Sequence, residues 1–365
     1  PLFVYRNVLR GLDHIHLEQT CEIFFGSLVR YIAIVISLLS GFKLIALSII
    51  FGISHCLPSL GAKAYLKKII PKFKISRADR DSEITKKMVK PSTSFFILMV
   101  SGSMLNSVDN VIIGSIIGVE SVPMYAVPMQ IIWLFVTTVG IASSIKMPLI
   151  SGLYKQRKLE ELKALFRTLL FFSVMIAFIF IFNLVLFGEI IIVNWAGPSI
   201  FPGQDVFYLM LIFAFLFSVV WPSDAILSAA EKHSSYANMT VLEALLNILL
   251  TIYLTYKFGI KGAVSGTIIS RLLTNGWFMF YQTLKTLEYK LLDFLIWVLR
   301  DIFFPLILLS SVTFLLSYFD ILMDFPFFIQ ILVWNLLIFL ILAVCSRQNI
   351  QKVLQTLKDS KQYNQ

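Results

Sequence analysis

The stretch 103-SMLNSVDNVIIGSIIG-118 decides the fold, because it is apolar enough for a membrane and yet contains a carboxylate. At 100° per residue, the polar residues of this stretch fall within about 160° of one another around a helix. The pattern predicts a membrane-spanning helix whose outer half carries a polar stripe, and we expect that stripe to face a wet interior. The stripe consists of Ser103, Asn106, Ser107, Asp109 and Asn110.

The composition of the whole chain supports a membrane location for this helix. Of its 365 residues, 58% are hydrophobic and 14% are charged, whereas a soluble domain has roughly a quarter charged residues. The apolar runs are too long for a membrane β-barrel, whose segments alternate over roughly ten residues. The predicted fold class is therefore all-α, a polytopic transmembrane helix bundle.

Ten segments have close to the roughly 20 apolar residues that a membrane span needs. The predicted spans are 22–40, 42–66, 93–117, 122–150, 165–188, 206–230, 238–256, 261–283, 300–319 and 326–346.

The distribution of basic residues gives the orientation of these spans. Alternate loops contain 25 of the 31 Lys and Arg residues, whereas the other set contains only Lys43, Lys257 and Lys261. The positive-inside rule places the first set, with both chain ends, in the cytoplasm. The net charge of +10 is then explained by topology and by anionic membrane lipids, so no nucleic-acid partner is expected.

The longest inner loop, 72–91, divides the chain after two helices. We expect residues 1–71 to be the remnant of an N-terminal lobe and 92–284 to be a C-terminal lobe. Residues 285–365 are expected to add two helices and a basic cytoplasmic tail. A weak echo between 41-GFKLIALS-48 and 259-GIKGAVS-265, six helices apart, indicates two parallel lobes. If the echo is real, the first lobe lacks its first four helices; two similar tight turns are the alternative.

Charged residues inside a membrane usually face a cavity or a partner, since each costs roughly 2.5–3.5 kcal/mol at the centre. Asp109 is a candidate for contacting substrate, together with Asn106 and Asn110, or for binding a coupling cation. A structural polar cluster between helices is the alternative for Asp109. Asp224, after Pro222, and Glu243, one turn into its helix, are further candidates for coupling-ion ligands. An interfacial position at the inner end explains Asp224 equally simply. For Glu243 the simpler explanation is the helix N-terminal dipole, which favours an acid.

Three cations are candidates for contacting an anionic head group: Arg30, Lys146 and Arg271. The guanidinium of Arg suits phosphate oxygens. The alternatives are an ion pair between Arg271 and Glu243, and snorkelling of Arg30 and Lys146 toward the membrane surface.

The sequence has no Walker loop, no GxSxG motif and no close pair among its three cysteines. We therefore expect no catalytic residues, no cofactor and no metal site, and a protein that is not an enzyme.

Several of these features together resemble a known family. The segments 106-NSVDNVIIGSIIGVESVPMYAVPMQI-131 and 145-IKMPLIS-151 are similar to polysaccharide (O-antigen or teichoic-type) flippases of the MOP exporter superfamily. The stretches 5-YRNVLRGLDH-14 and 258-FGIKGAVSGTIIS-270 resemble that group at the loop before its fifth helix and at the start of its twelfth. The residues that carry the first likeness are Asp109, Gly114, Gly118, Tyr125, Ala126, Pro148 and Ser151.

The resemblance implies a two-lobed MOP/MATE-like transporter in which this chain supplies helices five to fourteen, so that its N-terminus is truncated. It implies a flippase for an undecaprenyl-pyrophosphate-linked oligosaccharide in the bacterial cytoplasmic membrane, acting in cell-surface polysaccharide synthesis such as that of O-antigen and lipopolysaccharide. Arg271 and Lys146 would then hold pyrophosphate. Partners would be membrane lipids, the polysaccharide polymerase and other assembly proteins. Pro128 occupies the place where lipid II flippases have an Arg, which argues against lipid II as the cargo.

Two other functions remain open. A cation-coupled multidrug antiporter of the same superfamily would favour acidic residues in its cavity. A membrane-embedded polysaccharide polymerase or glycosyltransferase would carry a long outer loop with catalytic residues, whereas the loop 189–205 has only Glu189 and Asp205 as charged residues.

Overall fold

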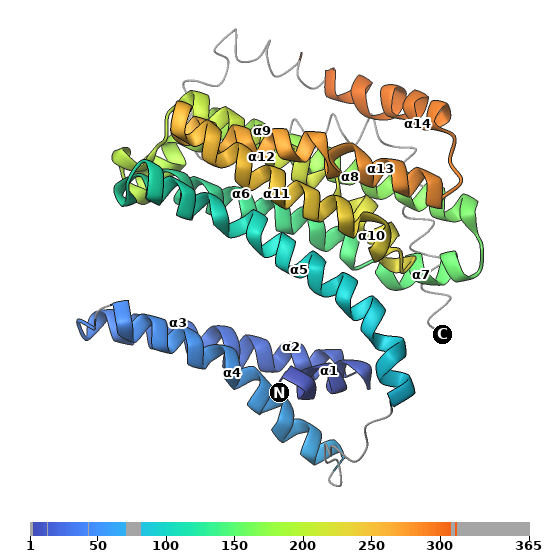
Figure 1. Cartoon of the computed structure of the whole chain (residues 1–365), viewed down its shortest axis with the longest axis horizontal. Helices are drawn as coiled ribbons and strands as arrows, with labels where there is room; N and C mark the ends of the chain where they lie inside the picture. The colour runs from blue at the N-terminus through green and yellow to red at the C-terminus, as the bar shows by residue number, and fades with distance from the viewer. Residues whose placement is uncertain (1–2, 13, 43, 71–81, 308–310, 312–365) are drawn as a thin grey trace. The chain divides into compact units, whose positions relative to one another are not determined.

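The computed structural model describes residues 3–12, 14–42, 44–70, 82–307 and 311 (Figure 1). These residues form helices joined by short connections, and no strand occurs among them. The chain divides into two compact units, Pro1–Thr85 and Lys86–Gln365. The division falls inside the predicted inter-lobe loop 72–91, of which residues 72–81 lie outside the described part.

The first unit contains the helices α1 (Phe3–Gly11), α2 (Ile15–Cys21), α3 (Val29–Leu39) and α4 (Leu44–Ile69), with a π-helical segment Glu22–Leu28 before α3. Helix α1 packs on α4. Arg6 of α1 forms ion pairs with Glu18 of α2 at 2.6 Å and with Glu22 of the π-helical segment at 2.7 Å.

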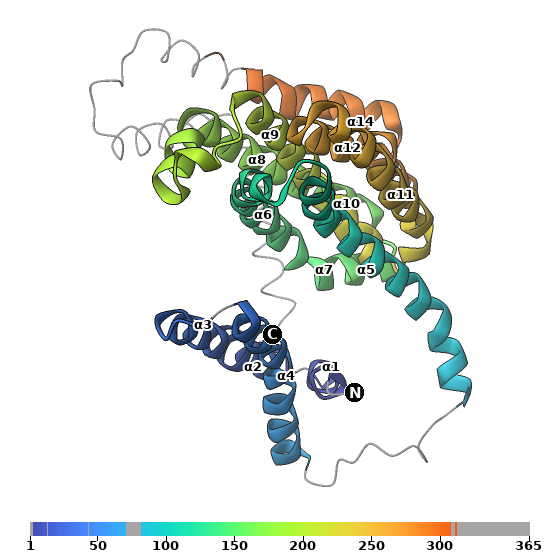
Figure 2. The same ribbon diagram turned by 60° about the vertical axis from the view of Figure 1, so that its left-hand side comes forward.

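The second unit is a larger bundle. It contains α5 (Ser82–Ile116), α6 (Val122–Ser144), α7 (Met147–Lys155), α8 (Leu159–Ala196), α9 (Gln204–Ser218), α10 (Trp221–Ala229), α11 (His233–Phe258), α12 (Ile260–Leu273), α13 (Asn275–Thr286) and α14 (Leu291–Val298). Helix α9 packs against α6, α8 and α12, and the lengthwise pairing of α8 with α9 is visible in Figures 1 and 2.

Within the described residues, seven helical segments are long and apolar enough to cross a membrane, and they correspond to the first seven predicted spans. They are Leu17–Leu39, Ile45–Ile69, Phe96–Ile116, Val119–Ile141, Leu159–Ala196, Gln204–Ala229 and Tyr236–Phe258. The chain is thus an all-α, multi-pass membrane protein. The predicted spans 300–319 and 326–346 fall largely or wholly outside the described residues.

Three predicted spans are interrupted. The prediction 261–283 was wrong as a single helix, because the chain breaks at Thr274 between α12 and α13. Asn275 and Gly276 follow that break, and both residue types have low helix propensity. The spans 122–150 and 206–230 break before Pro148 and Pro222, and each proline lies in the first turn of the next helix, where its missing N–H costs nothing.

Two helix boundaries also differ from the predictions. Helix α5 begins at Ser82, because its charged first turns, too polar for a membrane span, still form helix beyond the apolar part. Helix α8 continues to Ala196, which shortens the predicted outer loop 189–205.

Helices α11 and α12 form a tight hairpin. The turn between them uses Gly259 at φ +61°, and the echo position Gly41 has φ +73° before α4. A side chain at Gly262 would collide with Leu254 of α11, and a Cβ at Gly266 would lie 2.8 Å from the Cα atom of Thr251. Small residues at this spacing allow two membrane helices to approach closely. This close approach places the polar residues of α11 and α12 against each other.

Candidate functional site

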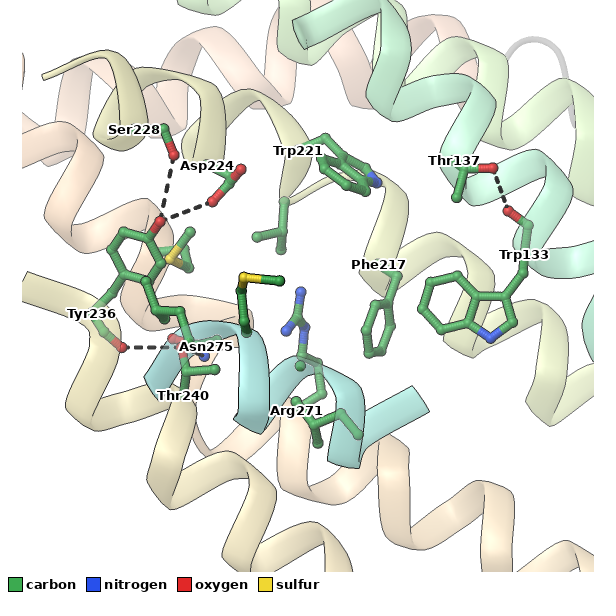
Figure 3. A pocket seen from close by; sticks show the side chains of 16 residues that line it. Trp133, Thr137, Phe217, Trp221, Asp224, Ser228, Tyr236, Thr240, Arg271 and Asn275 are labelled. Atoms are coloured by element: carbon green, nitrogen blue, oxygen red, sulfur yellow. Dashed lines mark hydrogen bonds between the residues drawn. The ribbon is translucent and has the colours of Figure 1, made fainter. Parts of the chain in front are cut away.

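A cavity of about 610 Å³ opens within the second unit, between α5, α6, α9, α10, α11, α12 and α13 (Figure 3). Most of these helices belong to candidate membrane spans. The volume of the cavity is within the range of small-molecule sites, roughly 300–1,000 Å³. Its polar and aromatic lining consists of Trp133, Thr137, Phe217, Trp221, Asp224, Ser228, Tyr236, Thr240, Arg271 and Asn275.

Arg271 is the cation among the described lining residues, and it is held by an acid behind it. Its Nη1 atom donates to both carboxylate oxygens of Glu243, at 2.9 and 3.2 Å. The Glu243 side chain is 1% exposed and that of Arg271 is 12% exposed. The guanidinium also lies 4.2 Å from the centre of the Phe217 ring, an arrangement that favours a cation. The Nε–H of Arg271 is buried without a hydrogen-bond partner among the described residues.

The helix break at Thr274 adds an amide to the same wall. Asn275, the first residue of α13, is 3% exposed and donates from Nδ2 to Thr240 Oγ1 at 3.0 Å. Its Oδ1 atom has no partner among the described residues. A Cβ at Gly276 would lie 2.7 Å from the carbonyl oxygen of Arg271, so a residue without a side chain permits this sharp turn. Two residues that line this cavity, Arg271 and Asn275, thus each have a buried polar atom without a partner among the described residues.

Asp224 lies on a different wall, one turn beyond the break before α10. Its carboxylate accepts a hydrogen bond from Tyr236 Oη at 3.1 Å, and Ser228 Oγ lies 3.5 Å from the same phenol oxygen (Figure 3). The cavity thus has an acidic group on α10 and a basic group on α12.

Aromatic rings form much of the remaining surface. Trp133 makes an edge contact with Phe217, with ring centres 5.5 Å apart. The indole ring of Trp221 packs against α6 at Gly140, where a Cβ atom would lie 2.7 Å from the ring. Both tryptophans are half-buried and face the cavity.

Asp109 lies outside this lining, in a buried network between α5, α6, α11 and α12. Its Oδ2 atom accepts hydrogen bonds from Tyr125 Oη at 2.6 Å and Thr267 Oγ1 at 2.9 Å. Asn247 donates from Nδ2 to the same threonine at 2.9 Å, and Thr251 approaches the carboxyl group as well. Asp109 is 3% exposed, so this arrangement matches the inter-helix polar cluster that was its alternative interpretation. Two other residues of the predicted polar stripe, Ser103 and Ser107, are exposed, whereas Asp109 is buried. The stripe therefore does not face a single environment.

Two oxygens in this network remain without a partner among the described residues, namely Asp109 Oδ1 and Asn247 Oδ1. Buried polar atoms are normally satisfied. The network therefore retains unused ligands for a small cation or a proton.

Of the other predicted site residues in the second unit, Asn110 and Lys146 are not among the described lining residues of the cavity. The side chain of Asn106 is outside the described residues, and Asn110 is half-buried with an unpartnered Oδ1 atom. Lys146 is half-buried at the junction of α6 and α7. Arg30, in the first unit, lies 5.1 Å from the centre of the Phe51 ring. Within the second unit, Arg271 and Asp224 thus line one cavity, and Glu243 forms an ion pair with Arg271.

Sequence reasoning missed the uncharged members of both groups. Tyr236, Asn275, Asn247 and Thr267 contribute hydrogen bonds at the two sites. Polar residues within otherwise apolar spans could have marked them, since Asn247, Thr251 and Thr255 follow one helix face at i, i+4 spacing.

Comparisons with known proteins give the fold class. No family model and no curated protein matches the chain. Among solved structures, one described as "Lipid II flippase MurJ, inward closed conformation" matches with a TM-score of 0.63 at 18% identity, covering 96% of this chain and 71% of that chain. Another, described as "protein A", matches with a TM-score of 0.50 at 18% identity, covering 77% of this chain and 67% of that chain. At this identity the likeness shows the fold alone, which is an all-α helical bundle like that of the matched structures.

Proposed function

We propose that this protein is a flippase that moves an undecaprenyl-pyrophosphate-linked oligosaccharide across the bacterial cytoplasmic membrane for cell-surface polysaccharide synthesis. The observation that carries the proposal is Arg271, which lines a cavity of about 610 Å³ between candidate membrane spans. The fold likeness to a lipid II flippase supports a lipid-linked cargo. The lipid-linked oligosaccharide and membrane lipids are the proposed partners.

The physical task explains why such a cavity is useful. A glycan head group cannot cross hydrocarbon without hydrogen-bond partners, since unsatisfied polar groups cost several kcal/mol each. The cavity offers guanidinium, carboxylate, amide and hydroxyl groups at membrane depth, while a polyprenyl tail remains in the bilayer. Transport of this kind needs no bond to be broken, so the proposed protein is not an enzyme.

We assign the coupling cation to the Asp109 network, where Asp109 Oδ1 and Asn247 Oδ1 have no hydrogen-bond partner among the described residues. A carboxylate with amide and hydroxyl oxygens suits Na⁺, and the carboxylate alone suits a proton. Thermal unfolding in NaCl, in KCl at equal ionic strength, and across pH separates these ions. We expect one of them to stabilise the wild type but not Asp109→Asn. Equal responses of both proteins would remove Asp109 from this role.

Asp224 and the aromatic lining favour a second candidate, a cation-coupled multidrug antiporter. A lipophilic cation would bind a carboxylate next to Trp133 and Trp221. The fold likeness to a lipid II flippase favours the first candidate over this one.

Native mass spectrometry of the protein, expressed from its complete gene and purified gently from its own host, tests the proposal. We expect a bound polyprenyl-pyrophosphate glycan that is lost in Arg271→Gln/Glu243→Gln, a variant that removes both charges of the buried pair. Arg300→Gln is the control, because Arg300 is exposed and pairs with Asp301. Binding of organic cations in competition with protons, without any such lipid, would favour the antiporter.

A further inference from the structure

The charges around the cavity do not fit a phosphate site. Arg271, the cation among the described lining residues, is neutralised at 2.9 Å by Glu243. Pyrophosphate carries several negative charges and would find no uncompensated cation among those described residues. Anion sites normally supply uncompensated cations or several N–H donors instead.

The unsatisfied polar atoms indicate a ligand with hydroxyl groups. Among the described residues, the buried Nε–H of Arg271 has no acceptor and the buried Oδ1 atom of Asn275 has no donor. A hydroxyl group can serve either atom, because it donates one hydrogen bond and accepts others. Tyr236, Thr240 and Asp224 add further polar groups to the lining of the cavity (Figure 3).

Aromatic residues of the same cavity suit the apolar face of a sugar ring. Trp133, Phe217 and Trp221 line the cavity together with the polar residues. The C–H groups of a pyranose carry small positive partial charges and are attracted to the negative face of an aromatic ring. Polar groups and aromatic rings in one cavity match the two kinds of surface that a sugar presents.

We infer that this cavity binds a sugar residue of the cargo, through Arg271, Asn275 and the two tryptophans, and does not bind the pyrophosphate. The inference rests on the proposed function and deepens it. It revises the expectation that Arg271 holds pyrophosphate. It also explains why an Arg in the membrane is paired with an acid, since the pair provides oriented N–H donors without a net charge.

Tryptophan fluorescence of the full-length protein tests this inference, because two of the six tryptophans line the cavity. The first probe is the oligosaccharide released by mild acid from the host's own polyprenyl-linked intermediates. The second probe is inorganic pyrophosphate. We expect the oligosaccharide to change the fluorescence in a saturable way and pyrophosphate neither to change it nor to compete.

Two variants locate the binding. Trp133→Leu should weaken oligosaccharide binding about tenfold, which is about 1.4 kcal/mol, and Asn275→Ala should weaken it similarly. Trp277→Leu is the matched control, because Trp277 is exposed and its indole donates to the carbonyl of Leu273. If a variant fails to fold, Trp133→Phe retains a ring and should weaken binding less.

Competition by pyrophosphate, or no response to the oligosaccharide, would overturn the inference. A separate translocation assay keeps the two claims distinct. Transport of the lipid-linked glycan without oligosaccharide binding at Trp133 would refute only this inference. Oligosaccharide binding without transport would refute only the proposed function.

Discussion

Replacing Glu243 by Gln should strongly destabilise the protein, because Arg271 would retain its charge without a counter-charge. The pair is buried, with side chains 1% and 12% exposed, and its shortest contact is 2.9 Å. Two charges about 4 Å apart at an effective dielectric constant of 20 attract by about 4 kcal/mol. Removal of one partner from a buried pair costs about 3–5 kcal/mol in measured cases. We therefore expect Glu243→Gln to lower the free energy of unfolding by about 3 kcal/mol.

The double variant Arg271→Gln/Glu243→Gln should recover most of that loss, because it removes both charges. Unfolding of the purified protein in detergent, followed by circular dichroism against added denaturing detergent, measures each value. Asp205→Asn is the control, since its pair with Lys261 is exposed and should contribute about 0–1 kcal/mol. The reasoning fails if Glu243→Gln costs no more than the control, or if the double variant is as unstable as the single one.

Three further predictions concern the packing around the site and the inner surface. Tyr125→Phe removes the 2.6 Å hydrogen bond to Asp109 and should cost about 1.5–3 kcal/mol in thermal or detergent unfolding; an unchanged stability would mean that this carboxyl group does not need the phenol. Gly266→Ala should lower the free energy of unfolding by about 1–3 kcal/mol, because the added methyl group overpacks against α11. The control Gly152→Ala has open space around it and should not destabilise the protein. Similar losses for both variants would contradict the close packing of α11 and α12. Burial raises the pKa of Tyr289, which lies outside the candidate spans. The unfolded chain therefore loses this proton first, and stability should fall as pH rises above about 10. Tyr289→Phe should flatten that fall, and an identical pH profile would refute the assignment.

The sequence predicted the spans well where hydropathy alone decides them. Seven predicted spans correspond to candidate membrane helices, because a run of about 20 apolar residues has few other stable environments. The breaks were harder to predict. Pro222 marked one of them, but the break at Thr274 depends on the contact between Gly276 and the carbonyl of Arg271, which no hydropathy pattern contains.

The candidate site was predictable in its charges but not in its arrangement. The Arg271–Glu243 ion pair was one of two interpretations open from the sequence, and the structure contains it. Asp109 could not be placed from its helix face, since the deciding contacts come from Tyr125 and from Thr267, which is 158 residues away. Contacts between residues so far apart in the sequence depend on how the helices pack, and the local periodicity of one helix does not contain that information.

The measurement that tests the central claim most directly is translocation of a lipid-linked glycan in proteoliposomes. The protein, made from its complete gene, is reconstituted with the host's polyprenyl-pyrophosphate oligosaccharide, and the glycan reaching the far leaflet is measured by its accessibility to a membrane-impermeant glycosidase. The account predicts that glycan becomes accessible faster than in protein-free vesicles, and that Arg271→Gln/Glu243→Gln slows this while Arg300→Gln does not. Glycan that stays as protected as in protein-free vesicles, with a verified folded protein and an imposed ion gradient, would contradict it.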